Sequence, residues 1–269
     1  MTLIIFTDLD GTLLNQEDYD YTPALAMLAQ LKQKGIPVIP VTSKTRAEVE
    51  GLRQEIGLED PFIVENGSAV FIPKDEYRFV VSQENQEGDY YLELLGCTYA
   101  KAREGLKIVA EDLGESLRGF GDLSAIEIQS LTGLSLEEVK LAKTREFTEP
   151  FVTPSHIPME KIEQTAAKYN FRVLVGDRFS HLIGKSAGKG RAVRWLMENY
   201  KSATAKKVVT VGLGNSPNDL EMLETVDIPI VIVSSKGVHP GLTEKGWQIA
   251  PSPGSQGWAE AVADICELV

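Results

Sequence analysis

The chain has 269 residues, of which 43% are hydrophobic and 25% charged, and its formal net charge is -12. This composition is ordinary for a soluble globular protein and suits one large or two smaller domains with a substantial core. The acidic balance argues against a nucleic-acid-binding protein, which normally presents a basic face. A phosphorylated ligand stays compatible with it, because a bound metal and a few local lysines can dominate the field within a site.

Cysteine usage and hydrophobic runs predict the compartment. Cys97 and Cys266 form no CxxC pair, which is typical of free thiols in a reducing cytoplasm. The first apolar run is too short for a signal peptide, and no stretch approaches the roughly 20 apolar residues of a membrane span. We therefore expect a cytoplasmic protein with neither a membrane nor a nucleic acid as its partner.

The first predicted strand ends in two aspartates. Residues 3–6 are apolar without alternation, which favours a buried strand, and DLDGT follows at residues 8–12. Side chains two residues apart in an extended segment point the same way, so Asp8 and Asp10 should face one cavity at the strand's carboxyl end. A hard cation such as Mg2+ would relieve their repulsion, and Thr12 adds a hydroxyl nearby. An acidic turn without a ligand is the alternative, because Asp, Gly and Thr are common in turns.

Strands and helices alternate on both sides of a central insertion. A helix with Leu25, Leu28 and Leu31 on one face leads to a strand at 36–41, a second helix, a strand at 61–64 and a hairpin-like segment at 69–81. After residue 185 the sequence predicts helices at 190–200, 218–224 and 257–268 and strands at 207–211 and 229–233. This rhythm predicts an α/β fold, a doubly wound and mostly parallel sheet.

The rhythm breaks between residues 84 and 185. That segment shows a mostly helical stretch at 90–113, a helix within 131–143 that Ser135 should cap, and short strands around a helix at 159–169. We predict a catalytic core of residues 1–83 and 186–269 and an inserted α+β cap of residues 84–185. Two linkers would permit a hinge, and such a lid excludes water from a site.

One short polar segment follows the second predicted strand, and another precedes the helix predicted at 190–200. Thr42 and Ser43 end the second strand, where they either donate hydrogen bonds to an anion or cap the next helix. Lys189 lies between glycines at the start of a helix. It either balances phosphate charge or is an ordinary surface lysine.

The last motif is GLGNSPND at residues 212–219, after a buried strand. Its GxG lacks the third glycine of a dinucleotide fingerprint and comes late in the chain. A second oxygen cluster fits better, with Asn215 and Asp219 as magnesium ligands, directly or through water.

Together these segments resemble the four motifs of the haloacid dehalogenase superfamily of phosphatases, in order and in position. Over nearly the whole chain, residues 41–46, 65–67, 145–149, 176–181 and 186–189 are similar to the mannosyl-3-phosphoglycerate phosphatases. One departure matters: where the family usually carries GDSPND, this chain has Asn215 in place of a carboxylate that normally binds the metal directly. An amide oxygen coordinates without the negative charge, so weaker magnesium binding is expected.

The resemblance implies phosphoryl transfer through an aspartyl-phosphate. Asp8 would be the nucleophile, and Asp10 would protonate the leaving oxygen and then activate water. Thr42 and Lys189 would hold the phosphoryl oxygens.

The resemblance also implies a Mg2+ site and a substrate pocket. Asp8, Asp10, Asn215 and Asp219 would hold the metal, Asp10 through its backbone carbonyl and Asp219 by orienting Lys189 or a bound water. Candidate contacts to the phosphate, carboxylate or sugar are Thr12, Ser43, Lys44, Asn66, Arg145, Glu146, Arg178, His181, Ser186 and Asn218.

We expect a phosphatase that hydrolyses mannosyl-3-phosphoglycerate, or its glucosyl counterpart, in compatible-solute synthesis. Two alternatives stay open. One is a broad sugar-phosphate phosphatase of the same fold, and the other is a catalytically weakened phosphometabolite-binding protein, which Asn215 suggests. The sequence does not specify the hexose or the oligomeric state.

Overall fold

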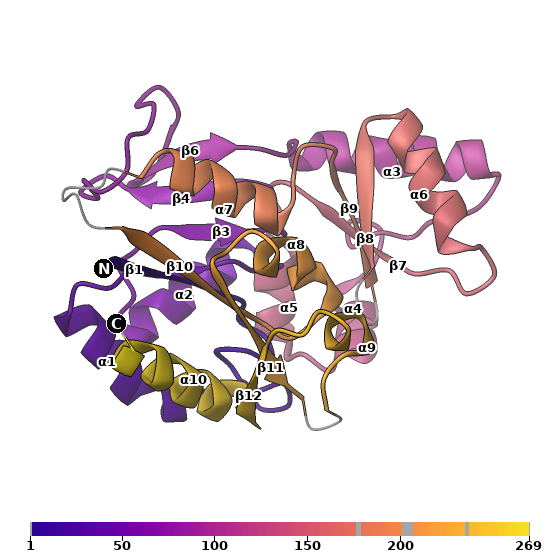
Figure 1. Cartoon of the computed structure of the whole chain (residues 1–269). Coiled ribbons are helices and arrows are strands. Elements are labelled where there is room, and N and C mark those ends of the chain that lie inside the picture. Colours follow the sequence, from indigo (N-terminus) through magenta and orange to yellow (C-terminus); the bar gives the residue numbers. More distant parts are fainter. Residues whose placement is uncertain (1, 176–178, 201–206, 235–236, 269) are drawn as a thin grey trace.

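The computed structural model describes residues 2–175, 179–200, 207–234 and 237–268, and Figure 1 shows their arrangement. A five-stranded parallel sheet runs through the molecule in the order β12-β11-β10-β1-β2. Its strands are β1 (Thr2–Thr7), β2 (Val38–Pro40), β10 (Val208–Gly214), β11 (Ile228–Val233) and β12 (Gln248–Pro253). The predicted parallel α/β fold is confirmed, and β12 is a strand that the sequence analysis missed.

Helices cover both faces of this sheet, which is why β1 is an unbroken apolar run. On one face, Leu3 and Ile5 pack with α1 (Leu25–Gln33), α2 (Arg46–Ile56) and α10 (Gly254–Leu268). On the other face, Ile4 and Phe6 pack with α7 (Lys189–Glu198), α8 (Leu220–Leu223) and α9 (Pro240–Thr243). A strand buried on both faces needs apolar side chains at every position, and these positions supply them.

A four-stranded sheet adjoins the carboxyl end of β2. It contains β3 (Phe62–Val64), β4 (Ala69–Pro73), β5 (Gln86–Glu87) and β6 (Tyr90–Leu94), all antiparallel, and a parallel bridge between Val41 and Ile63 links it to β2. The stretch at 90–113 is mostly helical, as predicted, but its first residues form the strand β6. Tertiary pairing of residues 90–94 with β4 overrides local helix propensity there, and the helix begins only at Tyr99.

The remaining elements carry a small sheet of their own. Strands β7 (Glu149–Val152), β9 (Phe179–Gly184) and β8 (Phe171–Val175) form it, and α3 (Tyr99–Leu113) and α6 (Met159–Lys168) pack on it around Phe151 and Leu182. Figure 1 shows this group to the right of the parallel sheet. Two short helices, α4 (Ala125–Thr132) and α5 (Leu136–Lys143), precede β7, and Ser135 caps α5 as predicted.

The predicted division into a core and a cap of residues 84–185 stays a prediction. Within that segment, β5 and β6 extend the sheet of β3 and β4, whereas β7 to β9 pair only with one another among the described strands. None of the helices formed by the described parts of the chain is both long and apolar enough to cross a membrane.

Candidate active site

One buried lysine joins two aspartates at the carboxyl ends of β1 and β10. Asp8 directly follows β1, Lys189 opens α7, and Asp219 ends the 3-10 helix η2 (Pro217–Asp219). The Lys189 Nζ lies 2.6 Å from Asp8 Oδ1 and 2.6 Å from Asp219 Oδ1. The Lys189 side chain is 0% exposed, so the alternative of an ordinary surface lysine is wrong. Three ionisable groups that are far apart in the sequence therefore share one buried site.

This arrangement perturbs the acidity of both partners. Burial, together with the Asp219 carboxylate, raises the pKa of Asp8 to about 7, although Lys189 acts in the opposite direction. Burial by itself would lower the pKa of Lys189, but Asp219 and Asp8 more than offset it, so the pKa is raised. Lys189 is consequently a permanent cation beside a carboxyl group that a bound cation would readily ionise.

Asp219 also holds the loop that follows β10. Its Oδ2 accepts hydrogen bonds from the backbone N–H groups of Asn215 and Ser216, both at 3.0 Å. Gly214 must lack a side chain, because a Cβ there would lie 2.6 Å from the Cβ of Asp219. Both oxygens of Asp219 are thus engaged by protein donors, and its predicted contact with the metal stays a prediction.

Asn215 presents an oxygen that suits a hard cation. Its Oδ1 is buried without a hydrogen-bond partner in the described structure, while its Nδ2 lies 3.5 Å from Gln16 Oε1. No three His, Cys, Asp or Glu side chains gather into a metal cluster among the residues whose placement is known. Mg2+ does not require one, because it usually keeps several waters and uses one or two carboxylates with the substrate phosphate. Asp8 and Asn215 therefore fit such an ion.

The predicted anion-binding side of the site contains buried hydroxyl groups. Thr42 follows β2 and is fully buried, and its Oγ1 accepts a hydrogen bond from the Lys44 N–H at 3.1 Å. Thr45, not Thr42 or Ser43, caps α2, so the alternative of a simple helix cap is wrong. Thr12 is also buried, and within the described ranges its Oγ1 has no hydrogen-bond partner.

A close backbone approach brings α7 into the site. Gly67 has a φ of +78°, and a Cβ on it would lie 2.2 Å from the carbonyl oxygen of Gly188 and 2.7 Å from the Lys189 nitrogen. Beside it, Asn66 Oδ1 accepts a hydrogen bond from Asn218 Nδ2 at 3.3 Å. The turn after β3 therefore touches both the start of α7 and the loop after β10.

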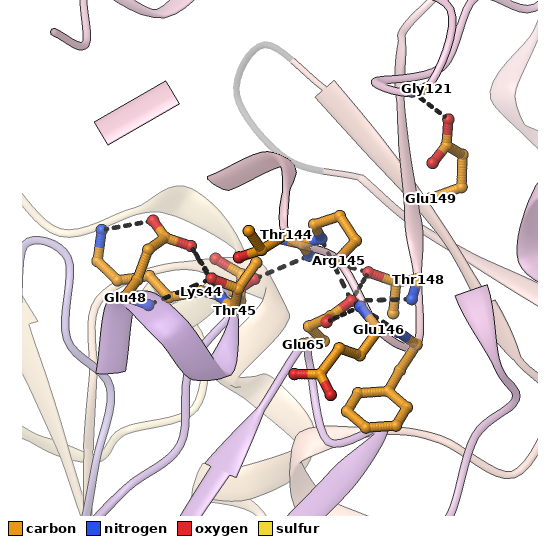
Figure 2. Close-up of polar contacts among 12 residues, drawn as sticks. Lys44, Thr45, Glu48, Glu65, Gly121, Thr144, Arg145, Glu146, Thr148 and Glu149 are labelled. Carbon is orange, nitrogen blue, oxygen red and sulfur yellow. Dashed lines mark hydrogen bonds and ion pairs between the residues drawn. The ribbon is translucent and has the colours of Figure 1, made fainter. Parts of the chain in front are cut away.

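Arg145 and Glu146 lie in a junction that Figure 2 shows around Glu65. Glu65 is fully buried and accepts hydrogen bonds from the N–H groups of Glu146 and Thr148, both at 2.8 Å, and from Thr148 Oγ1 at 2.7 Å. Arg145 Nε lies 3.2 Å from Glu65 Oε2, and its Nη2 donates to the carbonyl of Ser43 at 3.0 Å. The predicted substrate contacts of these residues stay predictions, but their polar atoms already bind protein partners.

The remaining predicted contacts are His181, Ser186 and Arg178. His181 lies on β9, and burial, with the charges of Arg145 and Lys189, lowers its pKa to about 3, so the imidazole is neutral. Ser186 is exposed, and Arg178 lies outside the described residues.

Lys44 lies close to the first motif, with its Nζ 3.0 Å from Asp10 Oδ1. Sequence reasoning missed Glu65 and Glu48 as neighbours of the site. For Glu48, the spacing from Thr45 matches a capping box and was an available signal. For Glu65, no local signal exists, because its partners lie about eighty residues later in the chain.

Comparisons with known proteins identify the family of this chain. The haloacid dehalogenase-like hydrolase family matches residues 5–236. A glucosyl-3-phosphoglycerate/mannosyl-3-phosphoglycerate phosphatase of Persephonella marina is 43% identical over 260 residues, which cover 97% of this chain and 96% of that protein. A protein of the same description from Methanococcoides burtonii is 38% identical over 273 residues, covering 98% and 97%.

Solved structures support the fold. The chain matches a sugar phosphatase of haloacid dehalogenase subclass IIB with a TM-score of 0.67 at 15% identity, over 100% of both chains. At this identity the likeness concerns the fold alone. With the family match and the two relatives, it confirms the resemblance found in the sequence: the chain belongs to the haloacid dehalogenase-like hydrolase family, as one of its phosphoric monoester hydrolases.

Proposed function

We propose that this protein hydrolyses mannosyl-3-phosphoglycerate, glucosyl-3-phosphoglycerate or both to the glycosylglycerate and phosphate, with Mg2+ as cofactor, in compatible-solute synthesis. The observation that carries the substrate class is the full-length relative at 43% identity that is described as a phosphatase for these two esters. The buried Asp8–Lys189–Asp219 arrangement supports the chemistry, because the carboxyl group proposed as nucleophile lies against a buried cation.

In the first step, a carboxylate oxygen of Asp8 attacks phosphorus, and the bond from phosphorus to the C3 oxygen of the glycerate breaks. Asp10, whose side chain is 31% exposed and whose Oδ1 lies 3.0 Å from Lys44 Nζ, gives the proton carried on its other oxygen to that oxygen. The products are the free glycosylglycerate and an aspartyl-phosphate. In the second step, Asp10 takes a proton from water, the water oxygen bonds to phosphorus, and the Asp8 carboxylate leaves.

Other residues hold the charges in place. Lys189 neutralises Asp8 and the phosphoryl oxygens, and Thr12 and Thr42 donate hydrogen bonds to the phosphoryl group. Asp8, the Asp10 carbonyl and Asn215 would hold Mg2+, which supplies neutralisation of the charge between nucleophile and phosphate. Asp219 keeps Lys189 and the Asn215 loop in position through the bonds described above.

The test is phosphate release from both glycosyl-3-phosphoglycerates and from a panel of hexose phosphates, with Mg2+ titrated. We expect release from the two glycosyl esters, a Mg2+ requirement, and no release by Asp8→Asn. Asn215→Asp should lower the Mg2+ concentration for half-maximal rate about tenfold, because it adds a charge to the ligand set. Equal rates on all hexose phosphates would indicate the broad phosphatase instead, and binding without release would indicate a binding protein.

A further inference from the structure

Lys44 lies in a partly buried cluster of charges beside Asp10. Its Nζ is 3.0 Å from Asp10 Oδ1, 3.7 Å from Glu48 Oε1 and 5.0 Å from the ring centre of Tyr19. The side chains of Lys44 and Glu48 are only 16% and 13% exposed. This cluster is therefore not a solvated surface ion pair, whose geometry would be loose and whose contribution small.

Glu48 is itself held by the start of α2. Its Oε2 accepts hydrogen bonds from the Thr45 N–H at 2.8 Å and from Thr45 Oγ1 at 2.9 Å, which leaves Oε1 facing Lys44. Thr45 is buried, and its Oγ1 lies 3.1 Å from the carbonyl of Leu141 on α5. The contacts thus run from the helix cap through Glu48 and Lys44 to the carboxylate of Asp10.

We propose that Lys44 is a positioning residue for Asp10, and that Glu48 holds Lys44 in place for this role. The proposal rests on the proposed function in one respect, the assignment of Asp10 as proton donor to the leaving oxygen. Asp10 lies within the turn that the Thr12 N–H closes onto the Leu9 carbonyl and is partly exposed, so its carboxylate has rotamers that point away from the scissile bond. The contact of Lys44 with Oδ1 selects one orientation and leaves Oδ2 to carry the proton, and a proton donor acts only within hydrogen-bond reach of the oxygen that it protonates.

The test compares kcat/KM for three phosphate esters, because this ratio covers the steps up to release of the alcohol. Glucosyl-3-phosphoglycerate has a poor alkoxide leaving group, a carboxylate and a sugar, and glycerol 1-phosphate has the poor leaving group alone. The third ester, p-nitrophenyl phosphate, releases p-nitrophenolate, which leaves without a proton. For Lys44→Met we expect kcat/KM to fall about tenfold for both alkyl esters and less than about threefold for the aryl ester. The loss is partial because Asp10 is still present, although its carboxyl group is no longer held in the productive orientation. Lys44→Arg should restore most of the loss, and Glu48→Gln should show the same pattern more weakly.

Other results would overturn the proposal. A loss confined to the glycosyl ester would make Lys44 a contact of the substrate's carboxylate or sugar, and an equal loss on all three esters would indicate a structural role. Lys32→Met is the matched control, because Lys32 also pairs with a glutamate, at 2.8 Å, but is 56% exposed. It should leave all three values unchanged.

Asp10→Asn separates this proposal from the one it rests on. It should show the largest difference between alkyl and aryl esters. If it shows none, the role proposed for Asp10 is refuted, and the positioning role of Lys44 with it. If Asp10→Asn shows the difference and Lys44→Met does not, only the positioning role is refuted.

Discussion

Glu65→Gln should loosen the junction between the turn after β3 and residues 145–148. The native carboxylate is fully buried, with Oε1 facing the Glu146 N–H and Oε2 facing Thr148 and Arg145 (Figure 2). A glutamine keeps the shape but removes the charge, and its NH2 group cannot accept a hydrogen bond. Whichever way the glutamine side chain is turned, its NH2 group therefore faces a hydrogen-bond donor of the protein and leaves that donor without an acceptor.

The expected loss in the free energy of unfolding can be worked out bond by bond. With its oxygen at the Oε2 position, the glutamine leaves the Glu146 N–H unsatisfied, at about 1–3 kcal/mol. The two short bonds to Thr148 lose their charge assistance, at about 1 kcal/mol each. Arg145 also becomes an uncompensated buried charge, and breaking a buried ion pair costs about 3–5 kcal/mol in all. These contributions overlap, and we expect a loss of about 4 kcal/mol.

Equilibrium unfolding in urea measures this loss as a shift of the midpoint at constant slope. Glu127→Gln is the matched control, since Glu127 also accepts from a backbone N–H and pairs with an arginine, but at 42% exposure. It should shift the midpoint far less than Glu65→Gln, because an exposed ion pair contributes little. A Glu65→Gln loss below about 1 kcal/mol would refute the reasoning, and so would a double variant with Arg145→Met that recovers no stability.

Three further predictions concern single residues. Lys189→Met should abolish activity and lower the free energy of unfolding by about 3–5 kcal/mol, because two buried carboxylates lose their shared cation; activity assays and urea unfolding check it. His181 stays neutral in the fold, with a pKa of about 3, whereas the unfolded chain binds its proton near the ordinary value of 6.5. Stability should therefore fall as pH decreases, by about 1.4 kcal/mol from about pH 7.5 to about 5.5, and unfolding curves of His181→Gln should lack this part of the slope. Gly67→Ala should cost about 3 kcal/mol and at least tenfold in kcat/KM, because its Cβ meets the Gly188 carbonyl. Gly57→Ala, with a similar φ of +72° and open space around it, should cost only about 1 kcal/mol and leave kcat/KM unchanged; equal effects of the two glycine variants would contradict this explanation.

Sequence alone was enough for features that depend on neighbours along the chain. The apolar run of β1, the aspartates that follow it and the cap at Ser135 each follow from local pattern and spacing. Strand-end motifs could also be assembled into one site, because parallel strands bring their carboxyl ends to the same edge. That rule brought the motifs of Asp8 and Asp219 together, whereas the place of Lys189 beside them was implied only by the family resemblance.

Only the tertiary structure decided which distant groups meet. Residues 90–94 form a strand because they pair with the edge of β4, and the local propensity of these residues contains no information about that partner. Glu65 pairs with Arg145, eighty residues later, and Lys44 pairs with Asp10 rather than with solvent. Such partners are selected by burial, because a charge that leaves water must find its counterion wherever the folded chain has placed one.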